Sequence, residues 1–550
     1  MKTIKIFAAC SFLLIALAGC DLTALNVNPN EPDDSVNYNM NYPRLASTLR
    51  NGIPMEGDDE QRVKALMIDF YAQIADGGNF TTKYYQMNED WNRRMYRRVQ
   101  SNVSSLNIVI RNLMEFGDEY RHTIAVAKIW RVFTQAYGVD FFGPIPFAKY
   151  SVVEENPPYM SVEDTYNEFF KELDEAANML SETSVMPIFI DSNSDILYRN
   201  NPAKWRLFAN SLRLRYALRL SEVAPELCRE QAAKALEAGV FSSSLDNAYL
   251  PPKADGSWGQ DYNYTMFQIT WGGALNMTKT FEKLVTGIGG VDFPLGISNQ
   301  RSGKALSNVH PDKVDPRAPV MFDPAYETGD WKGIVYGLPE GVYNVGANRT
   351  VNFSEFGFLY SNGYPYTTRP YDVMLYEEVC FLKAEAALMG VGGLDAKTEY
   401  EKGVRASFAT WGITSSVADS YLASTDKNLA GTSANFDDIS DTGNTKLEKI
   451  ITQKYIAAFP DVAMESWNDK RRLNLPRFDV SETRYEVFYD PTDKNIKNPK
   501  NFIRRVQYPV QESQINQVEY QKGVELLGGD DNVTTPLWWD KLSNYCTSLE

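Results

Sequence analysis

The chain has 550 residues with a formal net charge of −16 at pH 7, 43% hydrophobic residues and 13% aromatic residues. This composition supplies enough apolar surface for a large buried core. The acidic balance argues against a nucleic-acid-binding protein, which needs basic patches, and against charge-driven adhesion to anionic lipid. The two histidines, His122 and His310, are far apart, which argues against a serine-histidine triad or a zinc hydrolase.

The first twenty residues form a secretory signal. Lys2 and Lys5 precede an apolar run at 6–18, which ends in Leu17-Ala18-Gly19-Cys20. The run is too short and wrongly flanked for a transmembrane helix. The cysteine at the cleavage site resembles the bacterial lipoprotein box, in which the thiol is diacylated before cleavage. We therefore expect residues 1–19 to be removed and Cys20 to carry a two-chain lipid anchor.

No segment after Cys20 approaches a spanning apolar run, so we expect membrane contact through the N-terminal lipid only. The remaining cysteines are Cys228, Cys380 and Cys546, which are odd in number and widely spaced. They predict neither a disulfide framework nor a zinc site and fit small core residues. The sequence indicates no cofactor and no metal.

Helical periodicity begins near residue 60. Helices are predicted at 60–75 and 93–116, and the apolar segment 123–137 predicts a central, largely buried helix. The segment 161–181 is amphipathic, and Ser161 with Asp164 resembles a capping box. Asn201 and Pro202 open another helix, with arginines predicted on the side opposite its apolar face.

Further helices are predicted at 226–238, 273–285, 372–390, 396–411, 446–459 and 463–473. The segments 377–389 and 397–410 form the clearest helical hairpin, and three alanines in the first of them allow close helix approach. The hairpin resembles a tetratricopeptide unit, although no regular 34-residue period is present. We interpret the run Lys470-Arg471-Arg472 as a solvated helix end that the macrodipole favours.

Residues 246–371 hold 16 of the 35 glycines in under a quarter of the chain, together with many aromatic residues. Long irregular segments on a rigid scaffold are usually functional, and the aromatic residues argue for order. Residues 476–550 are again mostly irregular and are expected to wrap back over the helices. The run Asp191, Asn193, Asp195 begins like a calcium loop, but Ile196 and Pro202 break the pattern.

Five segments, in this order on one lipoprotein, resemble the SusD/RagB family of nutrient-binding outer-membrane lipoproteins of Bacteroidetes. The resemblance covers essentially the whole chain. Phe141-Phe142 lengthens the stretch between Asp140 and Gly143 and departs from the starch-binding members. The segments are Leu25-Asn26-Val27-Asn28-Pro29-Asn30; Ala136-Tyr137-Gly138 with Asp140 and Gly143-Pro144-Ile145-Pro146-Phe147; Ala384-Glu385-Ala386-Ala387-Leu388; Ile450-Ile451-Thr452-Gln453-Lys454 with Glu465-Ser466-Trp467-Asn468-Asp469-Lys470-Arg471-Arg472; and Arg504-Arg505-Val506-Gln507-Tyr508-Pro509-Val510-Gln511-Glu512 with Asn516 and Tyr520.

The resemblance implies a mainly α fold, an αα-superhelix of tetratricopeptide-like helix pairs with a loop-rich insert that carries the binding face. It implies a lipoprotein at the outer membrane, facing the cell exterior, that acts as a lid on a TonB-dependent SusC-like transporter. Such a protein captures an oligosaccharide, or in some members a peptide, and performs no chemistry. We expect one SusD-like domain at 20–550, with a helical scaffold at about 40–245 and 371–475, the insert at about 246–370 and a C-terminal wrap at 476–550.

A sugar presents apolar C–H faces that aromatic rings cover and hydroxyl edges that amides and carboxylates bond. Two stretches supply such residues, one between predicted helices and one in the glycine-rich insert. Tryptophans are the expected platforms, with Asp76 and Asn92 as hydrogen-bonding partners. The candidates are Asp76, Tyr84, Trp91 and Asn92 in the first stretch and Trp258, Tyr262, Trp271 and Trp331 in the insert.

Two other readings stay open. A surface glycoside hydrolase needs only two carboxylates roughly 5–10 Å apart in a cleft beside the aromatic residues, and the 71 acidic residues leave this possible. A peptide-binding lipoprotein of the same family would show a larger, more polar cleft with fewer stacking platforms.

Overall fold

The protein is mainly α-helical. A computed structural model of the chain describes residues 34–52, 72–74, 89–147, 149, 157–181, 194–251, 275–335, 342, 344–357, 370–440, 443–477 and 503–541. Within these parts of the chain, none of the helices combines the length and apolar character needed to cross a bilayer.

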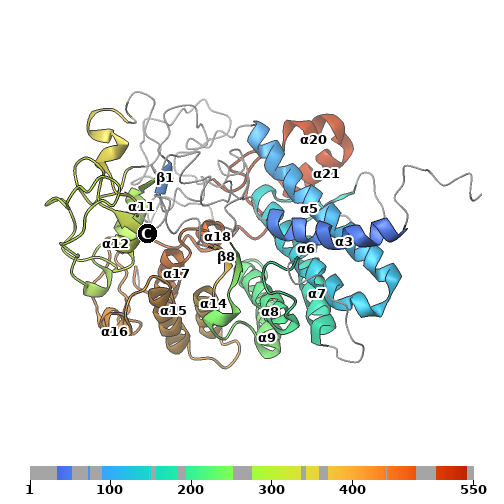
Figure 1. The fold of residues 1–550 in the computed structure, drawn as a ribbon, viewed down its shortest axis with the longest axis horizontal. Helices are drawn as coiled ribbons and strands as arrows, with labels where there is room; N and C mark the ends of the chain where they lie inside the picture. Colours follow the sequence, from blue (N-terminus) through green and yellow to red (C-terminus); the bar gives the residue numbers. More distant parts are fainter. Residues whose placement is uncertain are drawn as a thin grey trace, which may run out of the picture.

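From α3 to α15 the helices of the scaffold follow one another across the molecule in chain order (Figure 1). Each helix from α5 to α9 packs against the next, α8 packs against α14, and α14 packs against α15 and α17. This row of neighbouring pairs is the arrangement that the helical-hairpin pattern predicts. The helices are α3 (Asp34–Asn51), α5 (Glu89–Phe116), α6 (Arg121–Phe142), α7 (Val162–Ser181), α8 (Pro202–Arg219), α9 (Pro225–Ala238), α14 (Tyr376–Leu388), α15 (Ala396–Thr410), α16 (Ser415–Ala423), α17 (Lys446–Ala457) and α18 (Ala463–Leu473).

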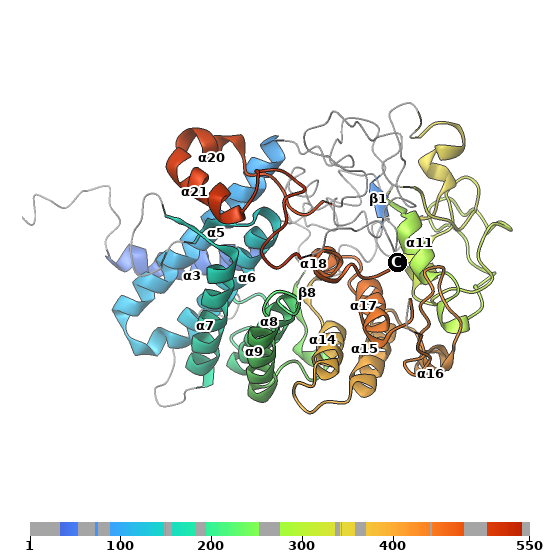
Figure 2. The same cartoon turned by 180° about the vertical axis from the view of Figure 1, so that it is seen from behind.

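Two C-terminal helices, α20 (Val510–Ile515) and α21 (Gln517–Leu527), return to the start of the scaffold. Both views show them over one end of α5 (Figure 2). Helix α20 packs against α5, and α21 packs against β3. The expected return of residues 476–550 over the helices is thus seen in the described part of that segment.

The glycine-rich insert carries short strands and short helices. Strands β5, β6 and β7 form an antiparallel sheet with β1, in the order β1-β5-β7-β6, while β2 pairs with β3 and β4 pairs with β8. The strands are β1 (Ala72–Ile74), β2 (Ile145–Pro146), β3 (Tyr159–Met160), β4 (Ala248–Leu250), β5 (Leu275–Met277), β6 (Phe322–Asp323), β7 (Glu355–Phe356) and β8 (Tyr371–Met374), and the short helices of the insert are α11 (Lys279–Val285) and α12 (Ala318–Met321).

The predicted helix starts are confirmed at α7 and α8. The backbone N–H of Asp164 donates to Ser161 Oγ at 3.0 Å, and Ser161 Oγ donates to the Asp164 carboxylate at 2.7 Å. Asn201 accepts from the backbone N–H of Lys204 at 3.1 Å, and Pro202 takes the first helical position. These contacts satisfy backbone donors that a helix leaves unpaired at its N-terminus.

The hairpin of α14 and α15 is also confirmed. Ala384 and Ala386 are buried, and Gly403 of α15 lies so close to Phe381 of α14 that an added Cβ would come within 2.7 Å of the ring. A small residue at this crossing lets the two helices approach closely. Helix α6 is buried along almost its whole length, as the apolar segment 123–137 predicts.

Three predicted helices differ from the structure at their ends. The segment 273–285 begins as strand β5 and becomes helical only at Lys279, and 372–390 begins as strand β8. Within 60–75, residues 72–74 form strand β1, and the rest lies outside the described residues. In each case a pairing with a distant strand determines the local conformation, which a sequence period cannot show.

Candidate functional site

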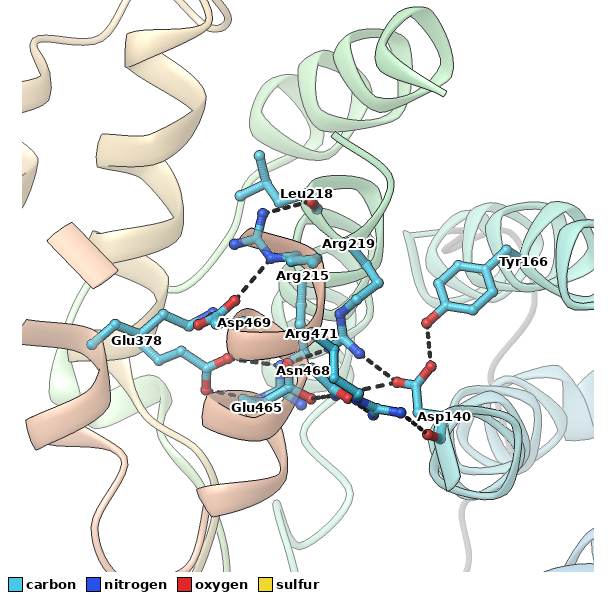
Figure 3. Close-up of polar contacts among 12 residues, drawn as sticks. Asp140, Tyr166, Arg215, Leu218, Arg219, Glu378, Glu465, Asn468, Asp469 and Arg471 are labelled. Atoms are coloured by element: carbon cyan, nitrogen blue, oxygen red, sulfur yellow. Dashed lines mark hydrogen bonds and ion pairs between the residues drawn. The ribbon is translucent and has the colours of Figure 1, made fainter. Parts of the chain in front are cut away.

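A cluster of ion pairs is buried where α6, α8 and α18 meet (Figure 3). Arg219 of α8 lies between Asp140 of α6 and Glu465 of α18 and pairs with both; its Nη1 is 2.5 Å from Asp140 Oδ2. Asp140 also accepts from the hydroxyl of Tyr166 at 2.7 Å. The side chains of the three charged residues are all less than one-tenth exposed. Three helices are therefore joined through one guanidinium.

The basic end of α18 is part of this cluster, which corrects the prediction that it is solvated. Lys470, Arg471 and Arg472 are at most 1% exposed. Arg471 donates to the backbone carbonyls of Asp140 at 2.8 Å and Arg504 at 2.7 Å. Arg472 pairs with Glu385 at 2.5 Å and with Asp469 at 2.9 Å. Buried cations need such partners because desolvation is costly.

The arginines of α8 require the same correction. Arg213, Arg215 and Arg219 are at most 4% exposed, whereas the sequence placed them on an outer face. Arg215 binds Glu378 with two hydrogen bonds of 2.7 Å. The helix is covered on both sides by neighbouring helices, so its polar face is internal and ionic.

The pKa values of the two carboxylates in the cluster are shifted in opposite directions. Burial alone would raise the pKa of Glu465, but Arg219, Arg215 and Lys454 outweigh it and hold the pKa near 2. Burial raises the pKa of Asp140 in spite of the opposing effect of Arg219 and Arg471. Both carboxylates are engaged by guanidinium groups and line a cavity of only about 30 Å³, so the cluster holds the scaffold together.

The cluster also fixes the C-terminal segment. Trp467 Nε1 donates to the carbonyl of Ile503 at 2.9 Å, and Arg505 donates to the carbonyl of Phe142 at 2.8 Å. Asp140, Glu465 and Arg471, which belong to segments that carry the family resemblance, are therefore scaffold residues. Their presence in the sequence therefore indicates the fold and carries no information on the ligand.

The four-stranded sheet pairs the described ends of two segments that hold candidate ligand residues. Ile74 at the end of β1 pairs with Leu275 at the start of β5. Asp76 follows Ile74 by two residues, which reach at most about 7 Å, and Trp271 precedes Leu275 by four residues, which reach at most about 14 Å. The ladder therefore joins the described ends of the two segments, while Asp76 and Trp271 themselves lie outside the described residues.

Trp331 is not available as a stacking platform, which corrects its assignment. The residue is 1% exposed, its indole N–H donates to the carbonyl of Phe322 at 3.1 Å, and its ring packs edge-on against Phe293. A tryptophan with both faces packed belongs to the core. Asn92 is likewise 2% exposed, and its amide donates to the carbonyl of Gln507 at 3.5 Å, so it is also removed from the set of ligand residues.

The other candidates are not located by the described residues. Trp91 is the third residue of α5, and its side chain lies outside the described part. Asp76, Tyr84, Trp258, Tyr262 and Trp271, like Cys20 and the start of the calcium-like loop at Asp191 and Asn193, also lie outside it.

The described end of the calcium-like loop has a structural role. Asp195 is fully buried and accepts hydrogen bonds from Trp205 Nε1 at 2.7 Å and from the backbone N–H of Asn200 at 2.7 Å. Among the described residues, no group of three or more histidine, cysteine or acidic side chains is placed to hold a metal ion. Cys228 and Cys380 are buried free thiols, as predicted for core residues.

One feature was not predicted. A groove of about 1310 Å³ opens between α3, α5 and α20, and Arg44, Arg94, Arg97 and Arg98 contribute to its lining. The sequence signal was available: four of the six residues 93–98 are arginine. In a predicted amphipathic helix, such a run is readily taken for an ordinary solvated face.

Comparison with known proteins identifies the family. The sequence model of the SusD-like family, described as "Starch-binding associating with outer membrane", matches residues 44–509. No protein of curated function matches the chain significantly.

Several solved structures share the fold. A SusD homologue from Parabacteroides distasonis is 56% identical, with a TM-score of 0.86 over 92% of this chain and 99% of its own. A SusD-like protein from Bacteroides thetaiotaomicron is 25% identical, with a TM-score of 0.71 over 92% of this chain and 99% of its own. A chitin-binding SusD homologue from Flavobacterium johnsoniae is 23% identical, with a TM-score of 0.70 over 92% and 100% of the two chains. The chain therefore belongs to the SusD-like family of outer-membrane-associated proteins.

Proposed function

We propose that this protein binds an oligosaccharide at the cell surface and delivers it to a TonB-dependent SusC-like transporter of the outer membrane. Lipid on Cys20 would anchor it there, and it would perform no chemistry on its cargo. The family description, which names starch binding and the outer membrane, supports the class of ligand and the location.

The pairing of Ile74 with Leu275 is the observation that carries the proposal for this chain. It joins the ends of two segments, one that leads to Asp76 and Tyr84 and one that comes from Trp258, Tyr262 and Trp271, and this supports a shared binding face. Aromatic faces beside a carboxylate are what a glycan chain requires. With Trp331 and Asn92 excluded by burial, we assign the stacking role to Trp91, Trp258 and Trp271.

The test uses the chain without residues 1–20 and a panel of polysaccharides, with binding and product analysis on the same samples. We expect retention by one class of glycan without cleavage. Trp91→Ala and Trp271→Ala should each weaken binding about tenfold. Phe116→Ala is the control, because this ring is 41% exposed at the opposite end of α5 from Trp91.

Each alternative gives a distinct result. Release of shorter sugars would support the hydrolase reading. Binding of peptides in place of glycans would support the peptide-binding reading, for which a polar cleft is expected. Unchanged affinity in both tryptophan variants would contradict the site and leave the class of ligand standing.

A further inference from the structure

The groove between α3, α5 and α20 carries a charge opposite to that of the whole protein. The chain has 71 acidic and 55 basic residues. Among the described residues that line the groove are four arginines and one carboxylate, Glu512. That carboxylate accepts from the hydroxyl of Tyr159 at 3.0 Å and from Tyr96 at 3.3 Å, so phenols hold it. The local field therefore favours an anion.

The arrangement of α5 explains why the arginines gather there. Its inner face packs into the core through Met95, Val99 and Val103, all at most 4% exposed. Arg94, Arg97 and Arg98 fall between these positions and turn outward by the helical period. Arg44 of α3 lines the groove from the other side. Two helices thus aim guanidinium groups at one space.

The rim of the groove is apolar and exposed. Met40 of α3 is 47% exposed and Ile515 of α20 is 72% exposed, and both line the groove. Val510 of α20 and Val518 of α21, near Ile515 in sequence, are 52% and 69% exposed. Clustered exposed apolar side chains beside cations are typical of surfaces that contact a membrane.

We propose that this groove binds a phosphate-bearing lipid headgroup of the membrane to which the chain is tethered. Arginines bind phosphate oxygens in a bidentate manner, and the hydroxyls of Ser47 and Ser105 add further donors along the groove. The apolar rim would contact the acyl boundary. The folded domain then touches the bilayer directly, which the overall negative charge does not predict.

The place of the groove along the chain supports this occupant. Helix α3 begins at Asp34, 14 residues after Cys20. Fourteen residues reach at most about 50 Å, and the groove-lining residues Met40, Arg44 and Ser47 belong to that same helix. The expected lipid anchor would therefore keep the start of the helix that lines the groove within about 50 Å of the membrane. This inference does not depend on the cargo.

The test uses the chain without residues 1–20, so that no lipid anchor contributes, and measures its sedimentation with phosphatidylcholine vesicles with and without phosphatidylglycerol. We expect binding only to the anionic vesicles, weakened by salt. The double variant Arg44→Gln and Arg97→Gln should bind about 25-fold more weakly, since each arginine near such a surface is worth about fivefold. Ile515→Asn should weaken binding several-fold with no change in charge.

A control double variant removes two positive charges from exposed arginines that lie outside the groove. Arg229→Gln with Arg405→Gln takes two arginines, 46% and 41% exposed, from α9 and α15, and should leave vesicle binding unchanged. Equal loss in both double variants would show a nonspecific charge effect and overturn the proposal. No binding of the wild-type chain to anionic vesicles would also overturn it, as would full competition by free pyrophosphate, which would indicate a soluble anion as the ligand.

Discussion

Asp140 and Arg219, 79 residues apart on α6 and α8, form an ion pair with a 2.5 Å contact in which both side chains are at most 3% exposed. The same guanidinium pairs with Glu465 on α18. A residue that compensates two buried carboxylates cannot be removed without leaving both partly unpaired. The helical scaffold is therefore held by directional ionic contacts as well as by apolar packing.

Arg219→Met should lower the free energy of unfolding by about 3–5 kcal/mol, because Asp140 and Glu465 would stay buried without their cation. Urea denaturation measures the effect. Arg229→Met is the matched control, since its pair with Glu226 is exposed and should contribute at most about 1 kcal/mol. Equal losses in the two variants would mean that the buried cluster has no special role.

Glu377 should make stability depend on pH. Burial raises the pKa of its carboxyl from 4.5 to about 7, with Asp372 and Glu378 adding to the effect, while Thr410 donates to it at 2.9 Å. The folded protein then holds a proton that the unfolded chain has lost between pH 4.5 and 7. The stability that this proton provides is complete below pH 4.5 and is lost as the pH rises through 7.

Glu377→Gln should remove this dependence. The wild type should lose on the order of 2–3 kcal/mol relative to the variant between pH 5 and pH 8. Denaturation of both proteins at the two pH values measures the difference. Glu226→Gln, at a side chain that is 91% exposed, should show no such trend. A constant difference between the wild type and Glu377→Gln across the pH range would refute the assignment.

Trp331→Ala should lower stability by about 3–5 kcal/mol, because it leaves a large cavity beside Phe293 and Phe322. Glycan affinity of the folded variant should equal that of the wild type. Calorimetric titration below the unfolding transition separates the two quantities. Loss of affinity without loss of stability would restore Trp331 as a ligand residue.

Cys20→Ala tests the anchor. Two acyl chains hold a domain stably on a bilayer, whereas a protein without them partitions into the aqueous fraction. We expect the variant expressed in its native host to leave the membrane fraction, and we expect metabolic labelling with a fatty acid to mark only the wild type. An unlabelled wild-type protein that stays in the membrane fraction would contradict lipidation.

Local signals in the sequence identified the helices and several of their ends. The capping pair of Ser161 and Asp164 and the apolar segment of α6 depend on neighbours a few residues away, which a sequence displays. The burial of Arg472 depends on Glu385, 87 residues away, and no helical period reveals that contact. A run of basic residues in a helix therefore predicts a solvated face even where partners from distant helices bury it.

The same limit applies to the candidate site. The sequence does not distinguish Trp331 from Trp271, because an aromatic residue in a glycine-rich segment fits both a ligand platform and a core position. The packing of Trp331 against Phe293 in the structure assigns it to the core. The arginine groove could not be predicted because its arginines come from two helices, α3 and α5. They line one groove only because these helices pack side by side in the folded protein.

The pairing of β1 with β5 also has a consequence for how the protein forms. The pairing of Ile74 with Leu275 closes a chain loop of about 200 residues. This closure lowers the conformational entropy of the chain before the short ladder of hydrogen bonds can stabilise the sheet. The sheet, beside which we propose the ligand site, should therefore form after the row of helices and unfold before it. Hydrogen exchange should find the amides of β1 and β5 less protected than those of α6. Mild destabilisation would then abolish cargo capture in a protein whose helices are still folded.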